Sequence, residues 1–439
     1  MLPKKKNIAQ QGLFTSFTDT LNQKHPLFLL ANKINWSVFE QSFNPLYCQD
    51  NGRPAKPIRL MVGLLILKHV RNISDESVVD QWSENSYYQY FCGEQSFVPG
   101  FPCEASELVH FRNRIGEQGI ALILKESIDV NGDDADHKDV NVDTTVQEKN
   151  ITFPTDAKLH RKMIKKCHAI AATEGITLRQ SYTRTMKKLG LAQRFRNHPT
   201  NKGKAIKADK KIKVIAGRLI RELERKLASD VYTKKLSFFK EVLAQTRHSS
   251  KKIYSLHEPE VQCISKGKEH KKYEFGNKVS IVYNLGGVIV GAKGFRNQYD
   301  GHTLEPALKQ VEELTGKAPL TATVDRGYRG RSTIGTTKIQ IPNPFSSKQT
   351  KYQQQKLKNA HRKRAAIEPV IGHLKSDHRL GRNFYKGIFG DNINIMLAAA
   401  AFNFKRMMNK WKKELLLFLL HLWDLVWLQN RKKISNIYY

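Results

Sequence analysis

The stretch Arg362-Lys363-Arg364-Ala365-Ala366-Ile367-Glu368-Pro369-Val370-Ile371-Gly372-His373-Leu374-Lys375 places one carboxylate, Glu368, among basic neighbours in an apolar pattern typical of a helix. At about 100° per residue, Arg364 and Lys375 fall within roughly 40° of Glu368 around a helix axis. A carboxylate can bind a metal ion while flanking cations bind phosphates, so such a face suits phosphodiester chemistry. A solvated helix face with one favourable charge pair is the alternative, and these residues alone leave it open.

Pro369 complicates the picture of a single helix. It directly follows Glu368, lacks a backbone donor and biases the preceding residue away from helical geometry. We therefore expect the main helix to start at Pro369 with Glu368 at its cap, or to kink there. Lys375 stays near the face of the carboxylate in both cases, whereas the positions of Arg364 and His361 depend on the bend.

Composition limits the class of protein. The 439 residues suffice for two or three domains, and a hydrophobic content of 40% is typical of a globular chain. A formal net charge of +34 predicts a polyanionic partner, with nucleic acid first and an acidic membrane surface second. The basic residues spread through folded-looking segments, which favours nucleic acid. The five cysteines lie far apart without a Cys-x-x-Cys pair, so they indicate neither a disulfide framework nor a zinc site, and we expect free thiols in a reducing cytosol.

Segments near both ends of the sequence lack the apolar pattern of a signal peptide or a membrane span. Lys4-Lys5-Lys6 has no apolar segment behind it, so it is not a signal peptide. Residues 415–428 are apolar but short, and His421 and Asp424 interrupt them, which indicates a packing or dimerising helix. We expect a cytoplasmic protein.

The N-terminal region is predicted to be helical. An apolar helix spans Pro57 to His69, and Ser74 caps a helix that runs through Trp82. Aromatic residues 87–91 and the segment from Ser106 to Arg114 predict two further helices. Short helices with basic ends could form a helix-turn-helix reader of DNA, and an ordinary helical bundle remains the alternative.

Two aspartates are placed at the ends of predicted strands. Residues 138–146 alternate as a half-buried strand that ends its alternation at Asp143, with Asp139 as a second candidate on the same side. Residues 320–325 form a short strand ending at Asp325, and the basic loop with Arg326 and Arg329 follows. Each aspartate could also be a simple turn former.

Between them lies a basic insertion. Residues 158–252 hold 27 Lys and Arg against six acidic residues, a surplus of 21. Apolar residues at helical spacing predict long helices with a cationic flank that can contact a DNA backbone without reading its sequence. A merely soluble basic hairpin is the alternative.

Beyond the insertion the pattern turns to strands. We predict strands over 254–263, 278–283 and 288–295, with Gly286-Gly287 as a hairpin turn. A helix over 304–314 and a short strand at 340–342 complete an α/β order. If the strands of Asp143 and Asp325 are neighbours, these residues and Glu368 can converge. Three hard oxygen ligands without cysteine favour Mg²⁺ or Mn²⁺ over zinc.

These motifs resemble those of a known family. Val142-Asp143-Thr144-Thr145, Val324-Asp325-Arg326-Gly327-Tyr328 and residues 364–375 resemble the three motifs of bacterial insertion-sequence transposases with a DDE, RNase H-like catalytic domain. Arg364, Glu368 and Lys375 keep the family's spacing, whereas His361 stands where the family has tyrosine. The segment from residue 12 to about 128 resembles the helical InsH-type domain of the same transposases.

The resemblance implies an α/β fold with an RNase H-like core, a helical N-terminal domain and a basic helical insertion. The implied boundaries are 1–132 for DNA binding, 133–410 for catalysis with the insertion at about 158–252, and 411–439 for an apolar helix and basic tail. It implies that two Mg²⁺ ions, replaceable by Mn²⁺, bind the three carboxylates. The phosphate-binding residues would be Arg364, Lys375, His361, Arg326 and Arg329.

By the same resemblance, the protein is a transposase that binds terminal inverted repeats and target DNA, cleaves, and transfers a 3′-hydroxyl. We expect a homodimer on DNA at the bacterial nucleoid. Two alternatives remain: a metal-dependent nuclease of the same fold without strand transfer, and a non-catalytic DNA-binding protein derived from a transposase.

Overall fold

The computed structural model describes residues 16–48, 54–227, 230–246, 248–265, 271–296, 298–342 and 350–435, without the side chains of residue 300 and residues 415–435. Lys4 to Lys6 thus lie outside the described residues, as do the side chains of the apolar segment 415–428. The chain folds as two compact units, Met1–Glu148 with Asn277–Tyr439, and Lys149–Gly276. Within the described part, no helix is long and apolar enough to cross a membrane.

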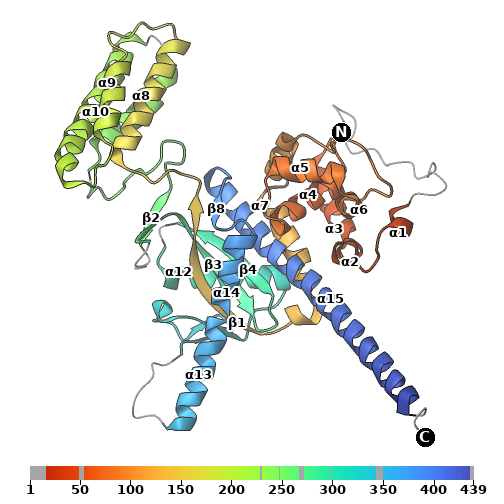
Figure 1. Cartoon of the computed structure of the whole chain (residues 1–439). Helices are drawn as coiled ribbons and strands as arrows, with labels where there is room; N and C mark the ends of the chain where they lie inside the picture. Colours follow the sequence, from red (N-terminus) through yellow and green to blue (C-terminus); the bar gives the residue numbers. More distant parts are fainter. Residues whose placement is uncertain are drawn as a thin grey trace. The chain divides into compact units, whose positions relative to one another are not determined.

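Helices make up the N-terminal part of the first unit (Figure 1). They are α1 (Phe17–Thr20), α2 (Pro26–Lys33), α3 (Trp36–Phe43), η1 (Asn44–Leu46), α4 (Ile58–Val70), α5 (Asp75–Glu84), α6 (Ser86–Phe91), α7 (Ala105–Asp129) and η2 (Gly132–Ala135). The predicted helices are confirmed, and Ser74 caps α5 by accepting the Ser77 N–H at 3.1 Å. The segment predicted to end at Arg114 continues to Asp129 through a kink at Gly116, whose φ is 66°.

A mixed sheet follows. Its strands are β1 (Asp139–Lys149), β2 (Gln262–Ser265), β3 (Tyr273–Asn284), β4 (Ile289–Phe295), β5 (Thr321–Thr323), β6 (Thr333–Ile334), β7 (Thr337–Gln340) and β8 (Arg382–Asn383). The order is β2-β3-β1-β5-β7-β6, with β4 paired to β3 and β8 to β1. β5 runs parallel to β1 and to β7, whereas β2, β3 and β4 pair antiparallel. The remaining elements are η4 (Arg326–Tyr328), α12 (Asp300–Thr315), α13 (Lys351–Ala365), α14 (Ile367–Asp377) and α15 (Gly387–Ser435).

Most predicted strands are confirmed, but two are not. The strand predicted at 340–342 lies earlier in the chain, since β7 ends at Gln340. The hairpin of β3 and β4 turns at Gly286-Gly287, where Gly287 has a φ of 89°. The strand predicted over 254–263 is wrong except for its last two residues, because β2 begins at Gln262. The Ser255 hydroxyl accepts the backbone N–H groups of His257 and Glu258, and Pro259 lacks a backbone donor, so this segment turns instead of extending.

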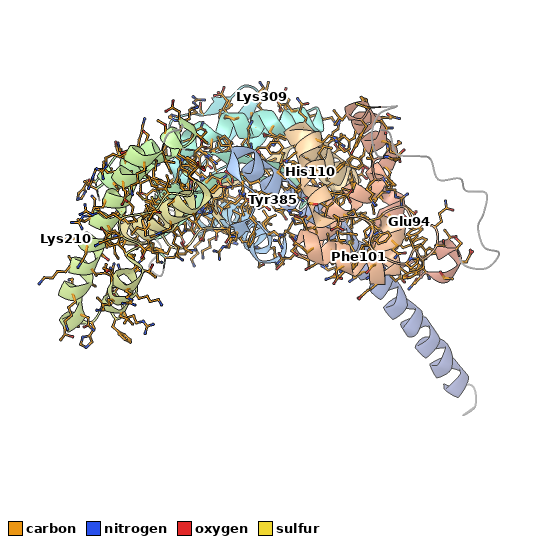
Figure 2. All side chains as sticks on the ribbon, turned by 90° about the horizontal axis from the view of Figure 1, so that it is seen from above. Glu94, Phe101, His110, Lys210, Lys309 and Tyr385 are labelled. Carbon is orange, nitrogen blue, oxygen red and sulfur yellow. The ribbon has the colours of Figure 1, made fainter. Side chains whose placement is uncertain are left out.

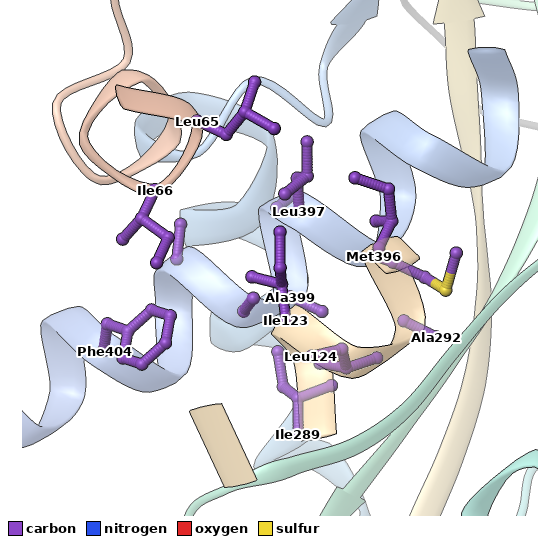
Figure 3. Packing of buried hydrophobic residues seen from close by; sticks show 14 of the residues in the cluster. Leu65, Ile66, Ile123, Leu124, Ile289, Ala292, Met396, Leu397, Ala399 and Phe404 are labelled. Atoms are coloured by element: carbon purple, nitrogen blue, oxygen red, sulfur yellow. The ribbon is translucent and has the colours of Figure 1, made fainter. Parts of the chain in front are cut away.

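The first half of α15 anchors the core of the first unit. Figure 3 shows its residues Met396, Leu397, Ala399 and Phe404 together with side chains of α4, α7 and β4, all of one buried cluster. The buried Asn403 side chain fixes this helix to β4, since it accepts the Ile289 N–H and donates to the Ile289 carbonyl, both at 2.9 Å. The helical N-terminal part and the sheet therefore share one hydrophobic core.

The second unit holds the basic insertion, and the predicted long helices are confirmed. They are α8 (Asp156–Thr173), α9 (Thr183–Ala192), α10 (Pro199–Lys226), η3 (Asp230–Tyr232) and α11 (Thr233–Ala244). Figure 1 shows α8, α9 and α10 side by side, and their apolar stripes form a separate buried cluster that includes Ile212, Ile215 and Leu219. This unit thus has its own core.

Candidate active site

Asp143 and Asp325 occupy equivalent register positions of two neighbouring parallel strands, Asp143 within β1 and Asp325 two residues past the end of β5. Asn141 of β1 pairs with Thr323 of β5, so counting two residues onward on each strand leads to the two aspartates. The position of Asp143 corrects one expectation. β1 does not end there but continues to Lys149, because the following Thr-Thr-Val favours extended backbone.

Asp325 does lie just beyond the end of its strand, as predicted. It caps η4, and its Oδ1 accepts the Gly327 N–H at 2.8 Å. Arg326 and Arg329 follow at once and are both exposed. The side chain of Asp325 is half-buried, with its orientation fixed by the turn that it caps.

Glu368 lies in the first turn of α14, at a break between two helices. α13 ends at Ala365 and α14 begins at Ile367, so the expected start at Pro369 is two residues late. The cause is still Pro369, because the ring of a proline clashes with the carbonyl four residues earlier, here that of Ala365. Proline is tolerated within the first turn of α14, where backbone N–H groups have no partner in the helix.

A long-range hydrogen bond holds this break against β1. The Asn141 side chain, only 2% exposed, donates to the Lys363 carbonyl at 2.8 Å. Asn141 and Asp143 point to the same side of β1, because side chains two apart in a strand share a face. The break between α13 and α14 therefore lies next to the face of β1 that carries Asp143.

Arg364 lies between the two carboxylates that this contact brings together. Its Nη2 is 3.6 Å from Asp143 Oδ2, and its Nη1 is 3.5 Å from Glu368 Oε1. The predicted pairing of Arg364 with Glu368 thus persists across the helix break. The Glu368 side chain is 60% exposed and that of Asp143 is 16% exposed, so the pair opens toward solvent on the Glu368 side.

The other predicted residues lie farther along the same elements. Lys375 is in the last turn of α14, seven residues or about 10.5 Å along the axis from Glu368, and His361 lies seven residues before Glu368 on α13. Asp139, the second candidate, accepts a hydrogen bond from the Thr321 hydroxyl on β5. Asn141 is the residue that sequence reasoning missed, although its alternation with Asp139 and Asp143 placed it on the same strand face.

The donor chemistry at the site fits a hard divalent cation, since only carboxylate oxygens are involved. In the described part of the chain, no group of three or more His, Cys, Asp and Glu side chains is arranged to hold a metal ion. The position between Asp143 and Glu368 is taken by a guanidinium. That the three carboxylates bind metal stays a prediction. All five cysteines are free thiols, as expected.

Comparisons with known proteins match two separate parts of the chain. Residues 15–114 match a transposase domain (DUF772), and residues 244–404 match a transposase DDE domain. The second match includes Asp325, Arg364 and Glu368, whereas Asp143 lies between the two. An uncharacterised protein, ORF8 of the nfe locus in Rhizobium meliloti, is 40% identical over 204 residues, which are 45% of this chain and 98% of that protein. No solved structure matches.

The mixed sheet flanked by helices and the matched DDE domain define an RNase H-like polynucleotidyl transferase. The chain belongs to the insertion-sequence transposases that combine a DUF772 N-terminal domain with a DDE catalytic domain. This membership implies DNA binding and DNA transposition, and enzymes of the class generally use divalent metal ions.

Proposed function

We propose that this transposase binds the terminal inverted repeats of its element, cleaves there in a metal-dependent step, and joins the freed 3′-hydroxyl to target DNA. The observation that carries the proposal is the position of Arg364 between Asp143 and Glu368, on a helix break held by Asn141. A guanidinium shared by two carboxylates supports a site that handles both cations and phosphates.

Asp143, Asp325 and Glu368 would hold two Mg²⁺ ions, or Mn²⁺ in their place, and bound ions of this kind would supply positive charge for activating the attacking oxygen and stabilising the leaving oxygen. Arg364 then exchanges its carboxylate partners for the phosphate beside the scissile bond, since a guanidinium binds either anion in the same bidentate manner. Lys375, His361, Arg326 and Arg329 contact neighbouring phosphates. This reaction requires no covalent bond between the protein and the DNA.

The partners follow from this chemistry. We propose double-stranded DNA as the substrate at both steps, a homodimer that holds two ends, and action on nucleoid DNA. Residues 1–132 would contribute end binding, 133–410 catalysis, and 411–439 the dimer contact.

The test is Asp325→Asn, which keeps the side-chain shape and removes the charge. We expect Mg²⁺-dependent cleavage of end DNA to fall by more than the roughly 10–100-fold that changes in outer-shell partners cause, with end binding retained. Asp139→Asn is the matched control, because Asp139 lies on β1 but bonds to Thr321. It should cleave normally. Undiminished cleavage by Asp325→Asn in Mg²⁺ would refute the assignment.

A strand-transfer assay with pre-cut, 3′-labelled ends and a target plasmid decides between the proposal and its alternatives. A transposase gives joined products. A nuclease of the same fold gives hydrolysis products alone, and a non-catalytic DNA-binding protein gives neither.

A further inference from the structure

Helices α8 and α9 of the second unit enclose a groove of about 910 Å³. Six Lys and Arg side chains and one histidine line it, without any acidic residue: Lys158, Arg161, Lys162, Lys165, His168, Lys187 and Arg194. Its floor is apolar and includes Ile164, Met186 and Leu191. Figure 2 shows side chains projecting from the helices of this unit and labels Lys210 of α10, which is not among the residues that line the groove.

In the part of the chain that the structure describes, the six Lys and Arg side chains of this groove form no ion pair. Acidic residues of the same unit pair with cations outside the groove: Lys149 with Glu258, Arg196 with Asp209, Lys226 with Glu222, Lys240 with Glu224 and Lys252 with Asp156. These five acidic residues therefore neutralise other cations. Six positive charges around an apolar floor repel one another, and this repulsion is relieved when an anion binds.

Arg161 shows how the groove is built. Its Nε donates to Gln193 Oε1 at 2.9 Å, which holds the guanidinium against the end of α9. Its Nη2 has no hydrogen-bond partner in the described part of the chain. A Cβ at Gly190 would lie 3.3 Å from this Nη2. A glycine within a helix destabilises it by about 1 kcal/mol relative to alanine. Here the Arg161 guanidinium lies against the space that a side chain at position 190 would occupy.

The spacing of the cations indicates an extended polyanion. On α8, Lys158, Arg161 or Lys162, and Lys165 follow one another by about one helical turn, or 5.4 Å. Lys187 and Arg194 face them from the α9 side. The groove thus has one row of cations along α8 and further cations facing it. This arrangement fits the successive phosphates of one nucleic-acid strand better than it fits a single small anion.

We propose that this groove binds the phosphate backbone of one DNA strand, independently of sequence, and so adds affinity to the end binding proposed for residues 1–132. The inference rests on the proposed DNA substrate and adds the place where the second unit contacts it. Backbone contacts of this kind release counterions, so binding must depend steeply on salt.

The test measures binding of the full-length chain to a fluorescent duplex of unrelated sequence over a series of NaCl concentrations. Lys165→Gln with Lys187→Gln removes two exposed groove cations. Since each lost phosphate contact lowers the slope of log K against log salt by about 0.9, we expect a decrease of about 1.8. The matched control is Lys211→Gln with Lys234→Gln, two exposed lysines on α10 and α11 outside the groove, which should keep the wild-type slope.

Gly190→Leu tests the groove itself, because it leaves the net charge unchanged and favours the helix. The added side chain displaces Arg161, and we expect binding to weaken several-fold. Equal slopes for the two lysine pairs, or wild-type affinity of Gly190→Leu, would overturn the inference. Because the readout is binding, loss of cleavage by the wild-type chain would count against the proposed function alone.

Discussion

Arg364 is the residue that connects two carboxylates of the candidate site. Its guanidinium lies 3.6 Å from Asp143 and 3.5 Å from Glu368, where a divalent cation would also be attracted. A cation and a guanidinium compete for the same negative charge. Because Glu368 is largely exposed, this pairing contributes little to folding stability, on the order of 0–1 kcal/mol. Its effect on ion binding should be larger than its effect on stability.

Arg364→Gln should therefore separate metal binding from catalysis. Without DNA, we expect Mn²⁺ to bind at least about fivefold more tightly, since two unit charges about 4 Å apart interact by about 1 kcal/mol even in water and Mn²⁺ carries two charges. Cleavage should fall, because the phosphate loses its guanidinium. Calorimetric titration measures the first effect and a cleavage assay the second. Arg362→Gln, an exposed neighbour on α13, is the control. Weaker Mn²⁺ binding by Arg364→Gln would show that Arg364 organises the carboxylates instead of competing for them.

At the scale of elements, the break between α13 and α14 sets the position of Glu368. Pro369 interrupts the helix at the carbonyl of Ala365, and Asn141 then fixes Lys363 to β1. Both constraints act on residues directly before Glu368. Two helices and one strand, α13, α14 and β1, thus together set the orientation of the Glu368 carboxylate.

Pro369→Ala should let α13 continue into α14. We expect a chain of equal or greater stability with cleavage reduced about 10–100-fold, because a small displacement of a catalytic group can have an effect of that size. DNA binding should persist. Pro306→Ala, a proline inside α12, provides the matched control and should cleave normally. Full activity of Pro369→Ala would mean that the break does not position Glu368.

Sequence patterns predicted local structure well and long-range contacts poorly. Apolar periodicity and the Ser74 cap placed the helices, and alternation placed β1, because these signals depend on neighbouring residues. The hydrogen bond from Asn141 to Lys363, 222 residues away, depends on a partner that no local pattern identifies. The spacing of Arg364 and Glu368 predicted their contact because it needs only one turn of helix.

At the scale of the whole first unit, a buried ionic cluster joins the N-terminal helices to the segment after β8. Asp75 accepts both Arg112 nitrogens at 2.8 and 2.9 Å and lies 2.8 Å from the Lys68 ammonium. Lys68 also donates to the Tyr385 hydroxyl at 2.8 Å, and the Arg112 guanidinium lies over the Tyr385 ring. Figure 2 labels Tyr385. Burial, reinforced by Arg112, lowers the pKa of Lys68 to about 8, although Asp75 opposes the shift.

This pKa predicts a pH dependence of stability. Above about pH 8 the folded chain loses the Lys68 proton that the unfolded chain keeps until about pH 10.5, so the free energy of unfolding rises with pH. Relative to Lys68→Met, the wild type should gain up to about 1.4 kcal/mol per pH unit between pH 8 and 9.5. Denaturant unfolding measures this difference. Exposed Lys33→Met should follow the wild-type profile, and parallel profiles for Lys68→Met and wild type would contradict the assignment.

The packing of α15 has a consequence for how such a gene can change. The same helix completes the core of the N-terminal helices and covers β4, so neither part keeps a closed interior without it. A reading frame that stops before residue 387 would therefore lose both at once, rather than leave a working DNA-binding fragment.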